Sequence, residues 1–119
     1  MIWIEEENMK DRLQEIWERQ KNFDNIVFAN AGVTREQVAN EIKVALITEI
    51  GELYNENPTF KFWKEQKNIE ITDKTKEEFV DCLHFLISLG QDIFKDEQEM
   101  FDWYCKKNDK NLLRQKTGY

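Results

Sequence analysis

Glycine and proline are scarce in this chain of 119 residues, which contains four glycines and one proline. Because these residue types most often end helices and form turns, their scarcity predicts few breaks along the chain. The sequence also lacks internal repeats, low-complexity runs and any clear strand pattern. Apolar residues recur instead at intervals of three and four, the period of amphipathic helices. We therefore expect an all-α fold.

Cysteine is also scarce, and long apolar runs are absent from the sequence. Two cysteines, Cys82 and Cys105, on a helical pattern are typical of reduced thiols, so we expect a cytoplasmic protein without a disulfide framework. The apolar start MIWI is too short for a signal peptide. No window approaches the run of roughly 18 apolar residues that indicates a membrane span. We expect no membrane partner.

Positive charge is in deficit, since the net charge is −7. Residues 106–119 hold five basic residues against Asp109, a local balance of +4, so the other 105 residues carry −11. An acidic body argues against the broad phosphate contacts of nucleic-acid binding. A short basic tail suits a small polyphosphate that is held partly by metal and partly by cations.

Aromatic residues are plentiful by contrast, with eight Phe, four Trp and three Tyr. A chain of this size buries only about 60–70% of the surface that its unfolded form exposes. Large apolar patches rarely stay exposed to water. We therefore expect a homodimer in which a subunit interface covers part of this aromatic surface.

The apolar spacing predicts one domain, residues 1–119, folded as a bundle of four to five helices. We expect helices at residues 5–28, 34–57, 73–93 and 96–115. Ala31-Gly32 should end the first helix, and Thr34 with Gln37 forms a capping box that should open the second. The third should begin at Asp73 or Thr75 and be the most buried. Residues 58–74 lack the helical period and form the longest connection.

Four carboxylates stand out on the second and third predicted helices. Glu49 and Glu52 are three residues apart, which places their Cβ atoms about 5–6 Å apart on one helix face. Glu78 and Asp81 repeat this spacing. If the helices pack side by side, the four like charges raise one another's pKa values, and a cation relieves the repulsion. Mg²⁺ fits, because it prefers oxygen ligands and completes its shell with substrate phosphates.

Simpler interpretations of these acids stay open. Thr75-x-x-Glu78 is itself a capping-box pattern, so Glu78 could serve only to begin a helix. Glu52 lies near Glu56 and could belong to a solvated acidic face. Glu49, however, shares an apolar stripe with Ile42 and Leu46, where an unpaired charge is not expected.

The pattern Glu49-x-x-Glu52 followed by Glu78-x-x-Asp81 resembles the signature of the all-α nucleoside triphosphate pyrophosphatases, the MazG-like superfamily. Within it the chain most resembles the dimeric dUTPases. Gln20-Lys-Asn-Phe-Asp24 is similar to the family's Gln-x-x-Leu-Asn/Asp element, although asparagine is common where Asp24 stands. Thr59–Lys64 looks like its Lys-x-Trp stretch. The segment Lys107-Asn-x-x-Asn111-x-x-Arg114-Gln-x-x-Gly-Tyr119 closely resembles its C-terminal motif.

The resemblance implies hydrolysis of dUTP to dUMP and diphosphate by a metal-activated water. It implies that Glu49, Glu52, Glu78 and Asp81 hold roughly two or three Mg²⁺ ions, with Mn²⁺ as a possible substitute, and that Glu49 takes the proton of the water. Attack on the α- or the β-phosphorus is left undecided. The implied substrate-binding residues are Gln20, Asp24, Lys61, Trp63, His84, Lys107, Asn108, Asn111 and Arg114.

Several of these residues could instead have purely structural roles. Trp63 could lie in the core and His84 could be a hydrogen-bonded core histidine. An isolated Gln20 would be a surface or interface residue. Lys107 and Arg114 could simply complement a helix dipole. Two other functions also stay open, namely a MazG-like or dCTP pyrophosphatase with a different base preference and a non-catalytic helical dimer that binds a protein.

Overall fold

The computed structural model describes residues 11–58, 62–63 and 70–118. The predicted substrate residue Lys61 lies outside these ranges. Within them the chain forms α-helices and one short 3-10 helix, and no strand, so the expected all-α fold is confirmed. The elements in chain order are α2 (Arg12–Ala31), η1 (Glu36–Val38), α3 (Ala39–Glu56), α4 (Asp73–Ile93) and α5 (Glu97–Thr117).

Polar residues set several helix ends. The ends of α2 and α3 lie close to the expected positions, but both helices start later than expected, at Arg12 and Ala39, where starts near residues 5 and 34 were predicted. Asp11 begins α2, because its carboxylate accepts a hydrogen bond from the backbone N–H of Gln14 at 2.7 Å. Gly32 ends α2 with a φ of 68°, a left-handed conformation that glycine adopts without a Cβ penalty. The predicted pair Thr34 and Gln37 exchanges two hydrogen bonds, of 2.9 and 3.3 Å, ahead of η1 and α3.

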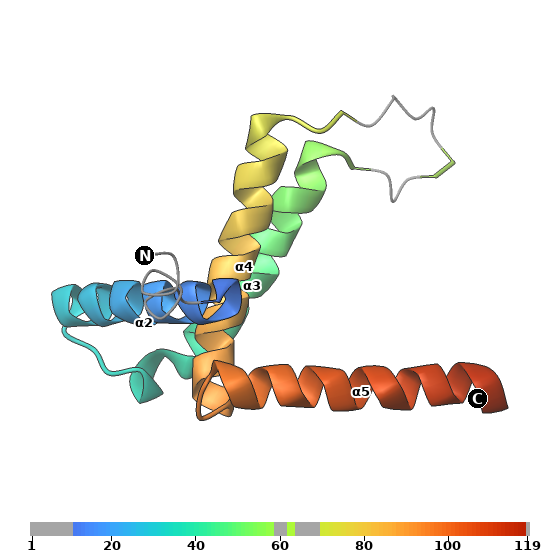
Figure 1. Cartoon of the computed structure of the whole chain (residues 1–119). Coiled ribbons are helices and arrows are strands. Elements are labelled where there is room, and N and C mark those ends of the chain that lie inside the picture. Colours follow the sequence, from blue (N-terminus) through green and yellow to red (C-terminus); the bar gives the residue numbers. More distant parts are fainter. Residues whose placement is uncertain (1–10, 59–61, 64–69, 119) are drawn as a thin grey trace, which may run out of the picture.

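Helices α3 and α4 form an antiparallel pair, the upright pair in Figure 1. The side chain of Asn57, directly after α3, ties the two helices together at one end. Its amide donates to the carbonyl of Glu70 at 3.1 Å and accepts from the N–H of Glu70 at 3.3 Å. Glu49 lies eight residues before Asn57 and Glu78 lies eight residues after Glu70. This clamp therefore sets a register in which the two glutamates are level.

The start of α4 decides between two interpretations of Glu78. The capping box consists of Thr72 and Thr75, whose hydroxyls each accept the other's backbone N–H at 3.2 Å. The alternative that Glu78 caps the helix through Thr75 is therefore wrong. Glu78 lies one turn further along and is only 5% exposed.

Helix α4 is the central element, since it packs against α3 on one side and α2 on another. Where α2 crosses it, a Cβ added to Gly90 would meet Cζ3 of Trp17 at 3.4 Å and Sδ of Met100 at 3.2 Å. This close approach explains a glycine within a helix, which costs about 1 kcal/mol relative to alanine. The third predicted helix was expected to be the most buried, but α4 has four buried residues, the same number as α2.

The apolar core of the described residues is small. Its buried members are Trp17, Phe28, Ile42 and Ile87. Helix α5 packs mainly against α2 and leads away from the base of α4 (Figure 1). The radius of gyration is 18.6 Å, against about 13–14 Å for a compact chain of this length. No described helix has both the length and the apolar character that a membrane crossing needs.

Candidate metal and nucleotide site

Three of the four predicted acids converge between α3 and α4. One carboxylate oxygen from each of Glu49, Glu52 and Glu78 lies within 4.8 Å of the others. The i, i+3 spacing on α3 supplies two of them, and the antiparallel register brings the third from α4. Glu78 is buried, Glu49 is half-buried and Glu52 is exposed, so the cluster opens to solvent on one side. We call this set the carboxylate cluster.

Asp81 lies beside the carboxylate cluster and not within it. Asp81 is exposed, and it does not belong to the set of three acids whose carboxylate oxygens lie within 4.8 Å of one another. Its negative charge nevertheless raises the pKa of Glu49. On α4 it lies three residues after Glu78 and three before His84, so it stands between the cluster and the helix face that meets α2.

Two oxygen atoms of the cluster are buried without a partner. Oε2 of Glu49 and Oε2 of Glu78 are shielded from solvent, and no hydrogen bond reaches either atom from the described residues. Burying a charged oxygen in this way is costly unless a cation or a proton compensates it. An all-oxygen set of this kind suits a hard divalent cation such as Mg²⁺. The residues therefore fit a divalent metal.

The electrostatics of the cluster reflect the same crowding. Desolvation raises the pKa of Glu49 above its ordinary value of 4.5, and a hydrogen bond with Glu52 and the charges of Glu52, Asp81 and Glu78 raise it further. Burial and the charges of three of these acids also raise the pKa of the neighbouring Cys82 thiol. Cys82 therefore stays a neutral thiol and not a reactive thiolate.

Lys74 supplies the one cation that contacts the cluster within the described ranges. Its Nζ lies 2.7 Å from Oε1 of Glu78, one helical turn away. The hydrogen bond and the charge of Glu78 raise the pKa of Lys74. Lys74 was not predicted from the sequence, although its i, i+4 spacing from Glu78 indicates that the two side chains can form an ion pair.

Gln20 and Asp24, predicted to bind the base, lie buried where α2 meets α4, with 5% and 6% exposure. The alternative that Gln20 is a surface residue is therefore wrong. Nε2 of Gln20 donates to Oδ1 of Asp24 at 2.8 Å. Oε1 of Gln20 lies 2.5 Å from Nδ1 of His84. The structure thus joins three of the predicted substrate residues into one hydrogen-bonded group.

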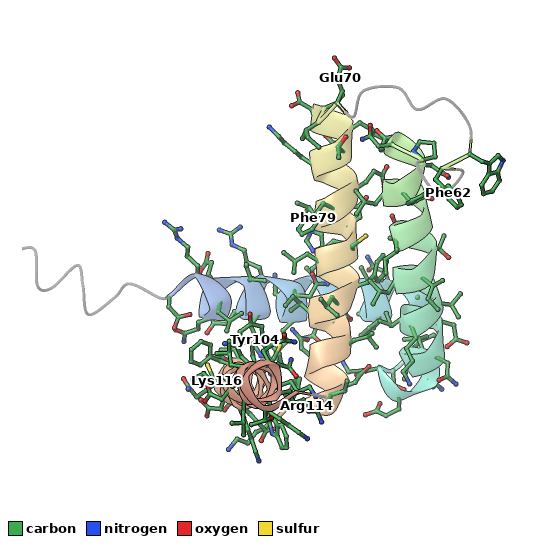
Figure 2. All side chains as sticks on the ribbon, turned by 90° about the vertical axis from the view of Figure 1, so that its right-hand side faces the viewer. Phe62, Glu70, Phe79, Tyr104, Arg114 and Lys116 are labelled. Carbon is green, nitrogen blue, oxygen red and sulfur yellow. The ribbon has the colours of Figure 1, made fainter. Side chains whose placement is uncertain are left out.

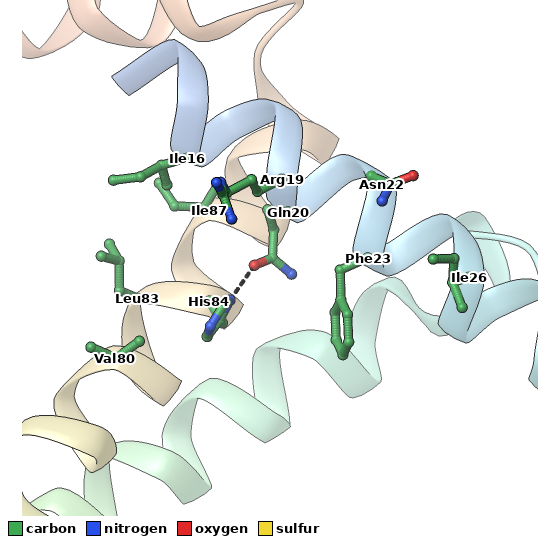
Figure 3. Close-up of a pocket in the computed structure, with 10 residues that line it drawn as sticks. All are labelled: Ile16, Arg19, Gln20, Asn22, Phe23, Ile26, Val80, Leu83, His84 and Ile87. Carbon is green, nitrogen blue, oxygen red and sulfur yellow. Dashed lines mark hydrogen bonds between the residues drawn. The ribbon is translucent and has the colours of Figure 1, made fainter. Parts of the chain in front are cut away.

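A pocket of about 530 Å³ opens between α2 and α4 beside this group (Figure 3). This volume is in the range of small-molecule sites. Gln20 and His84 form a polar part of its wall, and apolar side chains line most of the rest. The ring of Phe23 lies 6.4 Å from the imidazole of His84, tilted by 40°. His84 is exposed, so it is a hydrogen-bonded wall residue and not a core histidine.

The other predicted substrate residues that the structure describes do not line this pocket. Trp63 is 65% exposed and packs edge-on against Phe62, so the core alternative for Trp63 is wrong. Lys107, Asn108 and Asn111 are exposed on α5. Arg114 is half-buried and lies in the last turn, where a cation complements the helix dipole.

Figures 1 and 2 place α5 at the lower end of α4, and Figure 2 shows Phe79, the neighbour of Glu78, higher on α4. Tyr104 and Arg114 project from it in Figure 2. Within one chain, therefore, the structure does not bring the α5 residues to the carboxylate cluster.

Arg35 is the second residue that the sequence analysis missed. Its guanidinium donates to Oδ2 of Asp24 at 2.7 Å, to the carbonyl oxygen of Ser88 at 2.9 Å and to Asp92 at 3.1 Å. It also stacks over the ring of Phe28 at 5.1 Å. No local spacing joins Arg35 to these partners, since only the packing of α2 on α4 brings them together.

An all-α fold that carries clustered carboxylates on two packed helices, with an apolar pocket between α2 and α4, is typical of proteins that bind a metal and act on small molecules. A family model described as dUTPase matches residues 12–100. The chain belongs to this family, the all-α dUTPases, and is a dUTP diphosphatase, a hydrolase of nucleotide metabolism with a nucleotide substrate. Enzymes of the family generally use a divalent metal. No curated protein and no solved structure gives a significant match. The family match ends before Lys107 and the α5 motif.

Proposed function

We propose that the chain hydrolyses dUTP to dUMP and diphosphate in a reaction that depends on Mg²⁺ held by the carboxylate cluster together with Asp81. The observation that carries this proposal is the pair of buried, unpartnered oxygens on Glu49 and Glu78, two residues of one carboxylate cluster that come from two helices. Such a pair is unfavourable in a purely structural role, because like charges in a partly dry site repel. A divalent cation bound by these carboxylates would offset their mutual repulsion through its attraction to each of them.

The side chains of the cluster divide the work. Glu49, Glu52, Glu78 and Asp81 would hold Mg²⁺, which when bound would supply positive charge to neutralise the triphosphate and to make water more acidic. Glu49, half-buried and surrounded by acids, accepts the proton of the attacking water. Glu78 is held by its ion pair with Lys74, which fixes one of its oxygens and leaves Oε2 for the metal. Glu52, at the open side of the cluster, is a ligand within reach of solvent and substrate.

We propose that the nucleotide base and sugar enter the pocket between α2 and α4, beside Gln20 and His84. Asp81 then lies between the base pocket and the carboxylate cluster, because it precedes His84 by one turn. Lys61, Trp63, Lys107, Asn108, Asn111 and Arg114 remain proposed contacts to the nucleotide. Arg114 and Lys107 suit phosphate oxygens through charge-assisted hydrogen bonds.

A panel of deoxynucleoside triphosphates, each with and without Mg²⁺, tests this function. We expect diphosphate release from dUTP only with Mg²⁺, and a kcat/KM for dUTP about 10²-fold or more above that for dCTP, because a hydrogen-bonding pocket discriminates strongly. A preference for dCTP would support the alternative base specificity. Equal rates after complete removal of divalent metal would contradict the Mg²⁺ proposal.

We also propose that the chain forms a homodimer through α5. Phe101, Tyr104 and Leu112 share one face of this helix and are 50%, 70% and 55% exposed. The large radius of gyration and the sparse contacts of α5 within the chain support a second copy as the cover of this face.

Light scattering should give twice the monomer mass of 14.4 kDa for the wild type. We expect Leu112→Glu to shift the mass towards one monomer, because a buried unpaired charge destabilises an interface. Lys110→Glu, on the opposite face of α5, is the matched control and should leave the mass unchanged. A wild-type protein that is monomeric at every concentration would rule the dimer out.

A further inference from the structure

A chain of hydrogen bonds runs from Arg35 to the wall of the pocket. Arg35 and the hydroxyl of Ser88 both donate to Oδ2 of Asp24 at 2.7 Å. Oδ1 of Asp24 accepts from Gln20, and Gln20 in turn contacts His84. Ser88 is completely buried, and Gln20 and Asp24 are more than nine-tenths buried. This chain therefore lies in the interior until it reaches His84.

The direction of each hydrogen bond follows from its donors. Asp24, with two donors on Oδ2 and one of them a guanidinium, is a carboxylate and can only accept. The amide atom of Gln20 that faces Asp24 must then be its NH₂ group, so its oxygen faces His84. An amide oxygen can only accept, and Nδ1 of His84 must therefore carry a proton. A neutral imidazole with a proton on Nδ1 has a lone pair on Nε2.

We propose that Arg35 and Ser88 are positioning residues that act through Asp24 and Gln20 to lock His84 in the Nδ1–H tautomer, so that Nε2 accepts a hydrogen bond from an N–H or O–H donor of the bound nucleotide. The proposal rests on the proposed function, because it takes the pocket as the nucleoside site. Nε2 lies at the tip of an exposed pocket-wall side chain, and no described residue donates to it (Figure 3).

The Nδ1–H tautomer of His84 predicts which base the pocket prefers. The ring N3 of uracil carries a proton and can donate to Nε2, whereas N3 of cytosine carries none and presents a second lone pair. The 3′-hydroxyl of deoxyribose is the other donor that the nucleoside part of dUTP offers. The charged Asp24 also gains a role, because its pairing with Arg35 keeps it an acceptor and so leaves only one orientation for the amide of Gln20.

The tautomer can be measured directly, because His84 is the only histidine of the chain. Nitrogen-15 NMR of histidine-labelled protein at a pH of about 8.5, where free imidazole is neutral, distinguishes a protonated from an unprotonated ring nitrogen. We expect a protonated Nδ1 in the wild type and a mixture of tautomers in Gln20→Met. The same substitution at Gln14, elsewhere on α2, is the control and should leave Nδ1 protonated.

A wild-type protein with its proton on Nε2 overturns the proposal whether or not any variant folds. This readout needs no turnover, so it separates failure of the tautomer assignment from failure of the proposed function. Arg35→Met should give the same mixed tautomers as Gln20→Met, while Arg12→Met, an exposed arginine at the start of α2, should not. Unchanged tautomers in folded Arg35→Met would remove Arg35 from the positioning role.

Kinetics then identify the donor. We expect Gln20→Met to raise KM for dUTP about tenfold with little change in kcat, the cost of roughly one hydrogen bond. If N3–H is the donor, the wild-type preference for dUTP over dCTP should fall about tenfold in this variant. If the 3′-hydroxyl is the donor, the preference should persist, and the wild type should instead lose about tenfold in kcat/KM on 2′,3′-dideoxyUTP. An acceptor role for Nε2 would be contradicted if Gln20→Met kept the full preference for dUTP over dCTP and the wild type also used 2′,3′-dideoxyUTP as well as dUTP.

Discussion

Replacing Glu49 with glutamine is expected to lower kcat for dUTP by about 10³-fold, because it removes both a proton acceptor and a metal ligand. Glutamine has nearly the same shape, so the loss would reflect charge and not packing. Steady-state diphosphate release in saturating Mg²⁺ measures this effect. Glu41→Gln, an exposed acid at the start of the same helix, is the matched control and should keep wild-type turnover.

The same substitution should stabilise the metal-free protein. Glu49 is desolvated and faces the charges of Glu52, Asp81 and Glu78, so a neutral amide at this position relieves repulsion in the folded state. Chemical denaturation at pH 7.5 in a chelating buffer should give a higher unfolding free energy for Glu49→Gln than for the wild type. A variant that is both inactive and less stable would instead point to a structural role for Glu49.

Metal-free protein should lose stability as the pH rises above 4.5, and Mg²⁺ should restore it. The pKa of Glu49 is raised in the folded state, so from 4.5 upwards the folded chain binds more protons than the unfolded chain. The unfolding free energy therefore falls with pH until the folded pKa is passed. Mg²⁺ competes with these protons, and at 100 times its Kd it should add about 2.7 kcal/mol.

Urea denaturation at several pH values, with Mg²⁺ and with a chelator, measures this behaviour. The gain from Mg²⁺ should grow from acidic to neutral pH as the carboxylates lose their protons. In Glu49→Gln the gain should be smaller and the metal-free curve flatter. A gain that is independent of pH, or equal in the two proteins, would place the metal elsewhere.

Local patterns predicted the fold well, because the physics that sets helix ends acts over a few residues. Gly32, the pair Thr34 and Gln37, and the break at Asn57 each act within one turn, and each lies where the sequence indicates it. The acidic pairs were predictable for the same reason, since i, i+3 spacing fixes which side chains share a face.

Contacts between distant segments were not predictable in this way. Arg35 meets Asp24 and Ser88 only because α2 crosses α4, and no periodicity records that crossing. Asp81 shows that sequence neighbours alone do not decide exposure. It lies in an apolar stretch of sequence, yet the structure leaves it exposed at the edge between two packed faces. Burial depends on the helix face as well as on sequence neighbours.

The Asn57 clamp bears on how such an enzyme can vary over evolution. By pairing with both backbone groups of Glu70, one amide side chain holds α3 and α4 together at the end where the connecting segment leaves them. The register of the acids is then set by Asn57 and the helices and not by the residues between 57 and 70. That segment can accept insertions, deletions or new recognition residues while the metal ligands stay opposite each other. Substrate range and catalytic chemistry can therefore change independently.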